Sequence, residues 1–131
     1  MKSKFSLVLI LTLFTLSSVN AQSLYFCEDV DEDGYAINSS STFTITEDGG
    51  SLKMLVRMGE DVDVYGVYFK IFEVDSNSDE SYDNTIYQDV EPDWTWFWKE
   101  IIFYRSGKYN VYVYDEYDEY ITSGTIKIKM R

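Results

Sequence analysis

The chain has 131 residues, with 23 Asp and Glu against 11 Lys and Arg, and its formal net charge at pH 7 is −12. A protein this acidic repels the phosphate backbone of nucleic acids and the surface of anionic lipids, so we expect neither as a partner. The chain has no His, which excludes Ser-His and Cys-His nucleophiles and His-ligated zinc within one copy. We therefore expect a non-enzymatic protein with no cofactor, apart from the calcium ion considered below.

Residues 1–21 have the composition of a signal peptide. Two lysines precede the apolar run Leu7–Leu16, and small residues before Gln22 predict cleavage after Ala21. This segment holds two Lys and no Asp or Glu, so the mature chain would have a net charge of −14. No later run approaches the roughly 20 apolar residues of a membrane span. We predict a secreted or periplasmic protein without a transmembrane helix in its mature part.

The first predicted strand, Ser23–Asp29, contains the only cysteine, Cys27. Cys27 does not directly follow Ala21, as a lipid-attachment cysteine would. An unpaired cysteine cannot form an internal disulfide, and we expect its side chain to point inward.

Residues 22–131 show no helical periodicity but many short alternating runs between turn residues, the pattern of an all-β fold. We predict one domain, an immunoglobulin-like antiparallel β-sandwich of about 7–8 strands. After the first strand, Asp33-Gly34 predicts a tight turn, from which a short strand at Tyr35–Ile37 pairs back. The strands Thr42–Thr46 and Ser51–Met58 are then predicted to form a hairpin.

The middle and end of the chain supply the remaining strands. In Tyr65–Val74, alternate residues Val67, Phe69 and Ile71 are predicted to face the core. The polar segment Asp75–Asn84 is predicted to be a mobile surface loop. The other predicted strands are Thr85–Val90, ended before Pro92, a strand from Gly107, and Glu119–Met130 with Ile126, Ile128 and Met130 inward.

The stretch Trp94–Asp115 holds the clearest alternation, G-K-Y-N-V-Y-V-Y-D from Gly107 onward. Together with W-K-E-I-I-F-Y-R-S before it and E-Y-I-T-S-G-T-I-K-I after it, this run resembles the last three strands of immunoglobulin-like and PKD-type bacterial secreted domains. The resemblance covers the C-terminal third of the chain. It implies that the strands on either side of Gly107 lie in different sheets, and that the hydroxyl of Tyr109 bonds back to nearby backbone as a tyrosine corner. It implies an architecture and no activity.

Three tryptophans alternate at Trp94, Trp96 and Trp98, so an extended strand would place their rings on one face. Such a strip can stack against sugar rings, which gives one candidate function, a carbohydrate-binding module. The competing interpretation is that some rings fill the core, as large aromatics usually do. A bulge near Lys99 would then turn Trp98 inward and leave the other two outside.

Aromatic residues are also predicted on the face of the sheet that does not meet the core. The chain has 12 Tyr, 8 Phe and 3 Trp, and Tyr68, Phe72, Tyr112 and Tyr114 fall on the opposite parity from the core residues of their strands. The leading hypothesis is an exported binding or adhesion and structural module that contacts a protein or a cell-surface glycan through exposed aromatics, as a monomer or weak oligomer. The candidate binding residues are Trp94, Trp96, Trp98, Tyr112 and Tyr114.

One motif suggests a metal ion. Asp29, Asp31 and Asp33 precede Gly34 with the spacing of the first half of an oxygen-ligand calcium loop. The twelfth position is Ser40 rather than the usual bidentate Glu, so a plain acidic hairpin turn is the competing interpretation. Nearby, Asn38-Ser39-Ser40 matches a glycosylation acceptor, which matters only in a host that glycosylates exported proteins.

Overall fold

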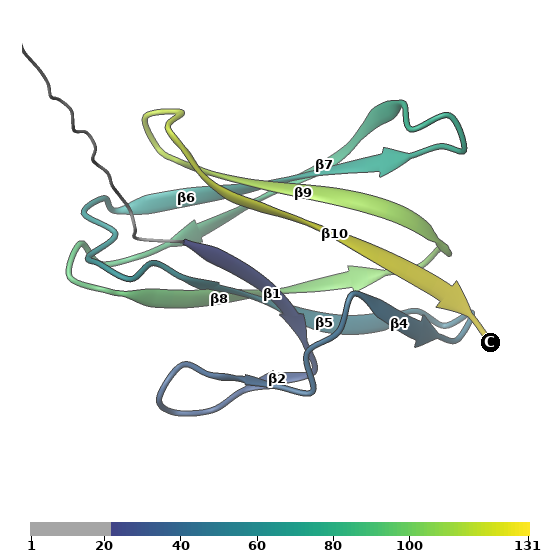
Figure 1. Cartoon of the computed structure of the whole chain (residues 1–131), viewed down its shortest axis with the longest axis horizontal. Helices are drawn as coiled ribbons and strands as arrows, with labels where there is room; N and C mark the ends of the chain where they lie inside the picture. Colours follow the sequence, from purple (N-terminus) through teal and green to yellow (C-terminus); the bar gives the residue numbers. More distant parts are fainter. Residues whose placement is uncertain (1–21) are drawn as a thin grey trace, which may run out of the picture.

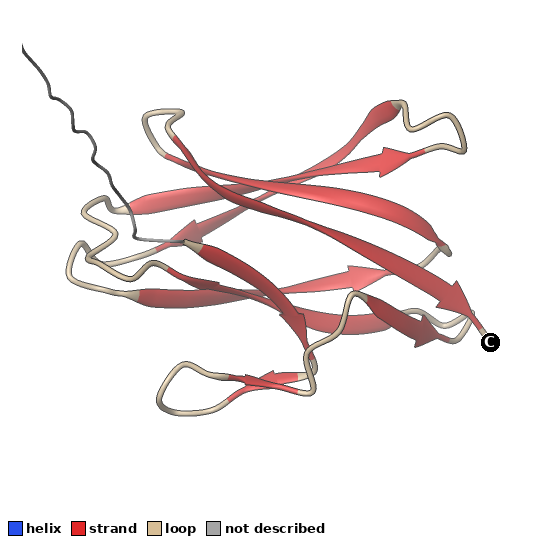
Figure 2. Cartoon of the chain, viewed as in Figure 1, coloured by secondary structure: helices blue, strands red, loops and turns tan. Residues whose placement is uncertain are grey.

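The structure is a computed structural model that describes residues 22–131, so the predicted signal peptide lies outside the described residues. All regular structure in this range is β-strand (Figure 2). In chain order the strands are β1 (Ser23–Cys27), β2 (Asp29–Val30), β3 (Ala36–Ile37), β4 (Thr42–Ile45), β5 (Gly50–Arg57), β6 (Gly66–Val74), β7 (Glu80–Asp89), β8 (Trp96–Phe103), β9 (Gly107–Asp115) and β10 (Tyr120–Met130). Since residues 22–131 contain no helix, none of them forms a helix able to cross a membrane.

Eight of these strands make the two layers of a sandwich (Figure 1). One sheet has the order β1-β5-β8 and the other the order β4-β10-β9-β6-β7. The remaining two strands, β2 and β3, form a separate short hairpin. The all-β immunoglobulin-like sandwich is confirmed, with one departure from antiparallel pairing: β4 runs parallel to β10.

The core fills the space between the two sheets. It is built from alternate residues of each strand, as the period of two in a pleated strand requires. Phe69 of β6 and Phe97 of β8 meet across the layers, with ring centroids 6.3 Å apart. Burying a phenylalanine side chain stabilises the fold by about 1.5–3 kcal/mol, so each of these two rings helps to hold the sheets together.

The connection from β8 to β9 crosses from one sheet to the other, as the resemblance implied. Gly107 has a φ of +148° at this corner. Tyr109 is buried, and its hydroxyl donates a hydrogen bond to the carbonyl oxygen of Arg105 at 3.0 Å. Its ring packs on Phe103, with centroids 4.8 Å apart. The predicted tyrosine corner is therefore confirmed at Tyr109.

The predicted hairpin of Thr42–Thr46 with Ser51–Met58 is wrong. A tight turn does exist, since the Gly49 amide bonds the Thr46 carbonyl oxygen at 2.9 Å. Beyond that turn the chain separates, because β4 pairs with β10 in one sheet while β5 pairs with β1 and β8 in the other.

The polar segment Asp75–Asn84 is a loop only over its first half. From Glu80 onward it belongs to β7, which pairs with β6 along its whole length. β7 is an edge strand with most of its side chains in solvent, so it can be polar on both faces, and its composition resembles that of a loop. The last strand, β10, also differs from the prediction at one residue, because Met130 is 40% exposed while Ile126 and Ile128 are buried.

The β2–β3 hairpin lies over the outer face of the three-stranded sheet (Figure 1). Cys27 and Leu55 point to this outer face and are nevertheless fully buried, because the hairpin covers them. Cys27 is thus buried as expected, but not in the core between the sheets. Arg57 fixes the hairpin by donating to the Gly34 carbonyl oxygen, and its guanidinium lies 4.1 Å from the centre of the Tyr35 ring.

Candidate binding surface

The outer face of the five-stranded sheet carries a continuous group of aromatic side chains. We call it the aromatic face, and its members are Tyr68, Phe72, Tyr82, Tyr87, Tyr112, Tyr114 and Tyr120. They come from the four neighbouring strands β7, β6, β9 and β10. None of them belongs to the core between the sheets, so the sandwich does not use them to hold its layers together.

The register of the ladders sets four of these rings in one row across the sheet. Tyr68 pairs with Tyr87 on one side and with Tyr114 on the other, and Tyr114 pairs with Tyr120. Ring centroids are 5.1 Å apart for Tyr68 and Tyr87 and 6.0 Å apart for Tyr114 and Tyr120. Directly opposed aromatic pairs of this kind stabilise a sheet by about 0.2–1 kcal/mol each.

A second group of rings lies further along β6, β7 and β9, toward the β6–β7 turn. Phe72 contacts Tyr82 at 5.8 Å and Tyr112 at 5.6 Å between centroids, both edge to face. This arrangement depends on a bulge, because Ile71 pairs with Asn84 while Phe72 pairs with Tyr82, which leaves Asp83 as an extra residue. Without the bulge, strand alternation would turn Tyr82 to the other face of the sheet from Tyr87.

Charged and polar groups are interleaved with the rings. The Lys70 ammonium lies 4.9 Å from the centre of the Tyr114 ring. Glu80 accepts hydrogen bonds from the Tyr112 hydroxyl and from the Asn110 side-chain amide, the latter at 2.6 Å. The bond from Tyr112, followed by that from Asn110, lowers the pKa of the Glu80 carboxyl, and the same contact raises the pKa of Tyr112.

At the other end of the aromatic face, a glycine makes room for a ring. A Cβ at Gly66 would overlap the ring and hydroxyl of Tyr87, so Tyr87 can lie across the neighbouring strand only because Gly66 has no side chain. A hydrogen bond with Asp89 raises the pKa of the Tyr87 hydroxyl. Tyr87 is therefore held in place by strand pairing, by Tyr68 and by Asp89.

Exposure divides the aromatic face into a centre and a rim. Tyr68, Phe72, Tyr112 and Tyr114 are half-buried by their neighbours. The rim residues Tyr82, Tyr87 and Tyr120 are 63%, 44% and 58% exposed. Tyrosines with a packed ring and a free edge are the type of residue that dominates the binding energy of protein interfaces.

The three rim residues were not among the candidates drawn from the sequence. Tyr82 lies in the segment predicted to be a loop, and only the bulge brings it to this face. Tyr120 lies just before a second irregularity of register, between Tyr120 and Thr122. The sequence does not show how the strands are paired, and the pairing register depends on these two irregularities. The alternation of residues along β9 was enough to predict that Tyr112 and Tyr114 lie on this face.

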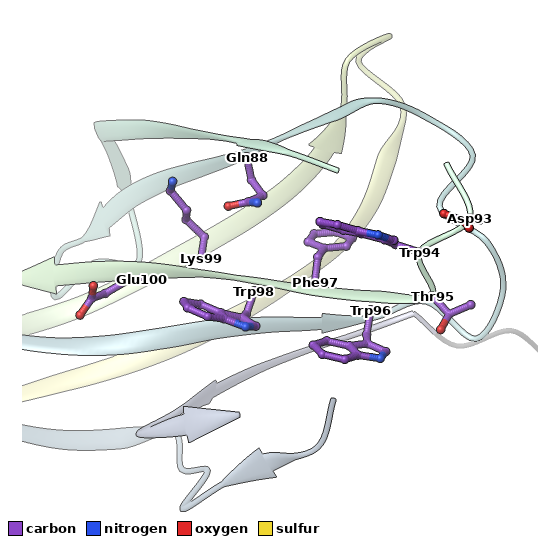
Figure 3. A pocket seen from close by; sticks show the side chains of 9 residues that line it. All are labelled: Gln88, Asp93, Trp94, Thr95, Trp96, Phe97, Trp98, Lys99 and Glu100. Carbon is purple, nitrogen blue, oxygen red and sulfur yellow. The ribbon is translucent and has the colours of Figure 1, made fainter. Parts of the chain in front are cut away.

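The three tryptophans do not form a single strip. β8 begins only at Trp96, and the ring of Trp94 lies beside Phe97, on the other side of β8 from Trp96 and Trp98 (Figure 3). The pairing of β5 with β8 is unbroken, so the bulge suggested near Lys99 is absent. Trp98 points outward rather than into the core.

Trp96 and Trp98 lie on the sheet face that the β2–β3 hairpin covers. A Cβ at Gly34 of the hairpin turn would overlap the indole ring of Trp96, so the turn rests directly on that ring. The Lys53 ammonium lies 4.3 Å from the centre of the Trp98 ring and 2.6 Å from the Asp29 carboxylate. Trp96 therefore supports the hairpin directly, and Trp98 supports it through Lys53.

An open groove of about 900 Å³ follows the free edge of β8. Trp94 is 39% exposed there. The groove is lined by Gln88, Asp93, Trp94, Thr95, Trp96, Phe97, Trp98, Lys99 and Glu100 (Figure 3).

The acidic motif forms the predicted hairpin turn. The Asp31 carboxylate accepts the backbone amides of Asp33 and Tyr35 at 2.9 and 3.0 Å. Asp29 is bound instead by Lys53, whose hydrogen bond lowers the pKa of that carboxyl. Within residues 22–131 no three acidic or cysteine side chains gather into a group that could hold a metal ion, and Asp29, Asp31 and Asp33 are not brought together.

No family model matches the sequence, and no curated protein matches it. Several solved structures resemble the fold, including the following two. One is an immunoglobulin-like protein, PA1606, from Pseudomonas aeruginosa, with a TM-score of 0.52 and 9% identity over 84% of this chain and 94% of that one. The other is the PmoD soluble domain from Methylocystis sp. ATCC 49242 (Rockwell), with a TM-score of 0.53 and 10% identity over 86% and 94% of the two chains. At this level of identity the likeness shows a shared immunoglobulin-like β-sandwich and no shared activity.

Proposed function

We propose that this protein is an exported, non-enzymatic binding module that contacts a protein or cell-surface ligand through the aromatic face. The observation that carries the proposal is the continuity of the face, seven aromatic side chains on four adjacent strands. The core between the sheets is complete without them. Contiguous apolar patches on a protein surface usually mark sites of interaction.

The arrangement of the face suits a protein partner. A contact surface gains most of its affinity from a few aromatic residues whose bodies are already packed, because little side-chain entropy is then lost on binding. The half-buried centre of the face meets this condition. Its rim rings Tyr82, Tyr87 and Tyr120 add hydroxyl groups that can hydrogen-bond a partner or water.

The test compares two triple variants of residues 22–131 for retention on the cells that export the protein. Replacing Tyr82, Tyr87 and Tyr120 with Ser is expected to lower retention by at least about tenfold. The control replaces Tyr65, Tyr104 and Tyr117, which are 65%, 63% and 73% exposed and lie outside the aromatic face. If the two triples lose retention equally, the aromatic face has no special role and the proposal fails.

A carbohydrate-binding module is the second candidate, supported by the groove along β8. Trp94 offers an exposed indole there, beside the amide of Gln88 and the carboxylate of Asp93. These are the groups that stack on a sugar ring and hydrogen-bond its hydroxyls. A glycan array probed with wild type and with Trp94→Ala tests it: a glycan bound by the wild type and lost in the variant supports a sugar site, and an array with no bound glycan rules it out.

A further inference from the structure

The aromatic face is flanked by opposite charges at its two ends. At one end Lys108 of β9 pairs with Lys127 of β10, and both side chains are exposed on the outer face. At the other end Asp89 is paired with Gly66, and Glu116 follows the end of β9. The β9–β10 turn and the C-terminus, which mark these ends, lie at opposite ends of the sheet (Figure 1).

The two ends differ in the sign of their charge. Glu80 also lies at the lysine end and keeps its negative charge, since its hydrogen bonds come from the neutral groups of Tyr112 and Asn110, but Lys108 and Lys127 outnumber it. The Glu116 carboxylate at the opposite end is likewise hydrogen-bonded, by the backbone amide of Tyr65 at 2.8 Å. At the opposite end, the β9–β10 turn contains Glu116, Asp118 and Glu119, and its sequence has no Lys or Arg. The face therefore has a basic row and an acidic row, separated by the aromatic rings.

Building on the proposed role of the aromatic face as a contact surface, we propose that its partner is a second copy of this chain, stacked face to face with its strands running in the opposite direction. A twofold axis lying in the plane of the interface, at right angles to the strands, would then set the lysine row of each copy over the acidic row of the other. The rings of the two copies would pack between these rows. Such an interface is self-complementary, as closed twofold dimers require.

Charge selects this orientation over the alternatives. Stacking with strands in the same direction would oppose lysines to lysines and carboxylates to carboxylates, which costs free energy at both ends. A uniformly basic partner would match the acidic row but meet Lys108 and Lys127 at the other end. A uniformly acidic partner would be repelled by Asp89 and Glu116.

The dimensions of the face predict a weak dimer. Four strands spaced about 4.8 Å apart, each about eight residues long at about 3.3 Å per residue, cover a plane of roughly 500 Å². Stable interfaces bury about 800 Å² of accessible surface on each partner. Side chains raise the accessible area above that of the plane, so the contact falls at the lower end of specific interfaces, and micromolar rather than nanomolar affinity is expected.

The experiment uses paired charge reversals in residues 22–131, measured by sedimentation equilibrium in about 0.15 M salt. One variant carries Lys108→Glu and Lys127→Glu, and the other carries Asp89→Lys and Glu116→Lys. Each alone has like charges at both ends of the face, so its self-association is expected to weaken by about tenfold or more. Mixed together, the two variants should form a heterodimer at least as strong as the wild-type dimer.

The mixture also controls for net charge, because the four charge units removed from one variant are added to the other. A second control, Glu32→Lys with Glu47→Lys, makes the same change in net charge as the second variant but at exposed turn residues. It should associate like the wild type. A wild-type protein that stays monomeric up to about 1 mM, or a mixture that does not recover association, overturns the proposal.

The outcome separates this inference from the proposed function. If the wild type is monomeric but the Tyr82, Tyr87 and Tyr120 variant still loses retention on cells, the face binds a different partner and only the dimer is wrong. If the charge-reversed variants behave as predicted but retention is unchanged in the tyrosine variant, the face serves self-association alone and binding to the cell surface is wrong.

Discussion

The hydroxyl of Tyr109 and the carbonyl oxygen of Arg105 are joined by a 3.0 Å hydrogen bond across the corner where the chain passes from one sheet to the other. Burial raises the pKa of the Tyr109 hydroxyl, which favours the protonated form that donates this bond. This bond fixes the corner from inside the sandwich.

Replacing Tyr109 with Phe should therefore destabilise the protein by about 1–2 kcal/mol, because the Arg105 carbonyl oxygen loses its donor while the ring contact with Phe103 is kept. Urea denaturation of residues 22–131 measures the change. The matched control is Tyr112→Phe, whose hydroxyl bonds an exposed carboxylate, and it should cost less than about 0.5 kcal/mol. Equal effects of the two variants would show that the corner bond contributes nothing particular.

The hairpin over the outer face should be released by a substitution in its turn. Gly34 has a φ of +83° and rests on the Trp96 ring, so Gly34→Ala adds both backbone strain and an overlap. Lifting the hairpin would expose Cys27, and its reaction with a thiol reagent should become at least about tenfold faster.

The control for this experiment is Gly59→Ala. Gly59 has a similar φ of +76°, but a Cβ there meets no atom within 4 Å. It should bring the same backbone strain and leave the thiol as slow to react as in the wild type. Equally fast reaction of both variants would mean that global instability, rather than the hairpin, controls access to Cys27.

The Glu80 carboxyl should make the free energy of unfolding depend on pH in the acidic pH range. Its pKa is lowered in the folded protein, chiefly by the Tyr112 hydroxyl, so its stabilising contribution is complete above the unfolded pKa of about 4.3 and is lost as pH falls through the folded value. In Tyr112→Phe the Glu80 pKa should rise toward its ordinary value. Carbon-13 NMR titration of the Glu80 carboxyl measures this directly, and an unchanged pKa would show that the hydroxyl does not act on it.

Chelation tests the remaining calcium prediction. The Asp29 and Asp31 carboxylates are engaged by Lys53 and by backbone amides, so we expect EDTA to leave the melting temperature unchanged. A decrease of several degrees would instead reveal a bound ion that stabilises the native state by mass action.

Alternation along single strands predicted much of this fold. It identified the buried residues Val67, Phe69 and Ile71, and the G-x-Y-x-V-x-V pattern located the corner at Tyr109. It could not show which strands would pair, because alternation tells which face a residue occupies and not which strand lies beside it. For that reason β4 was assigned to a hairpin with β5, although its partner is β10 at the far end of the chain.

The candidate binding surface was predictable in part for the same reason. Tyr112 and Tyr114 follow from parity, but Tyr82 reaches the aromatic face only through the extra residue Asp83, and one inserted residue reverses the facing of everything beyond it. The tryptophan strip failed because Trp94 precedes β8 and is held in a turn, where its amide bonds the Glu91 carbonyl oxygen at 3.0 Å.

The parallel pairing of β4 with β10 also has a consequence for how the chain folds. It joins Thr42–Ile45 to Lys127–Met130, so the edge of the five-stranded sheet cannot form until both of these distant segments are present. Contacts between such distant segments cost loop-closure entropy before they bring any stabilisation, and they slow folding. A chain in which residues 127–130 are not yet available therefore lacks a completed sheet, and the edge of β10 stays uncovered until it pairs with β4.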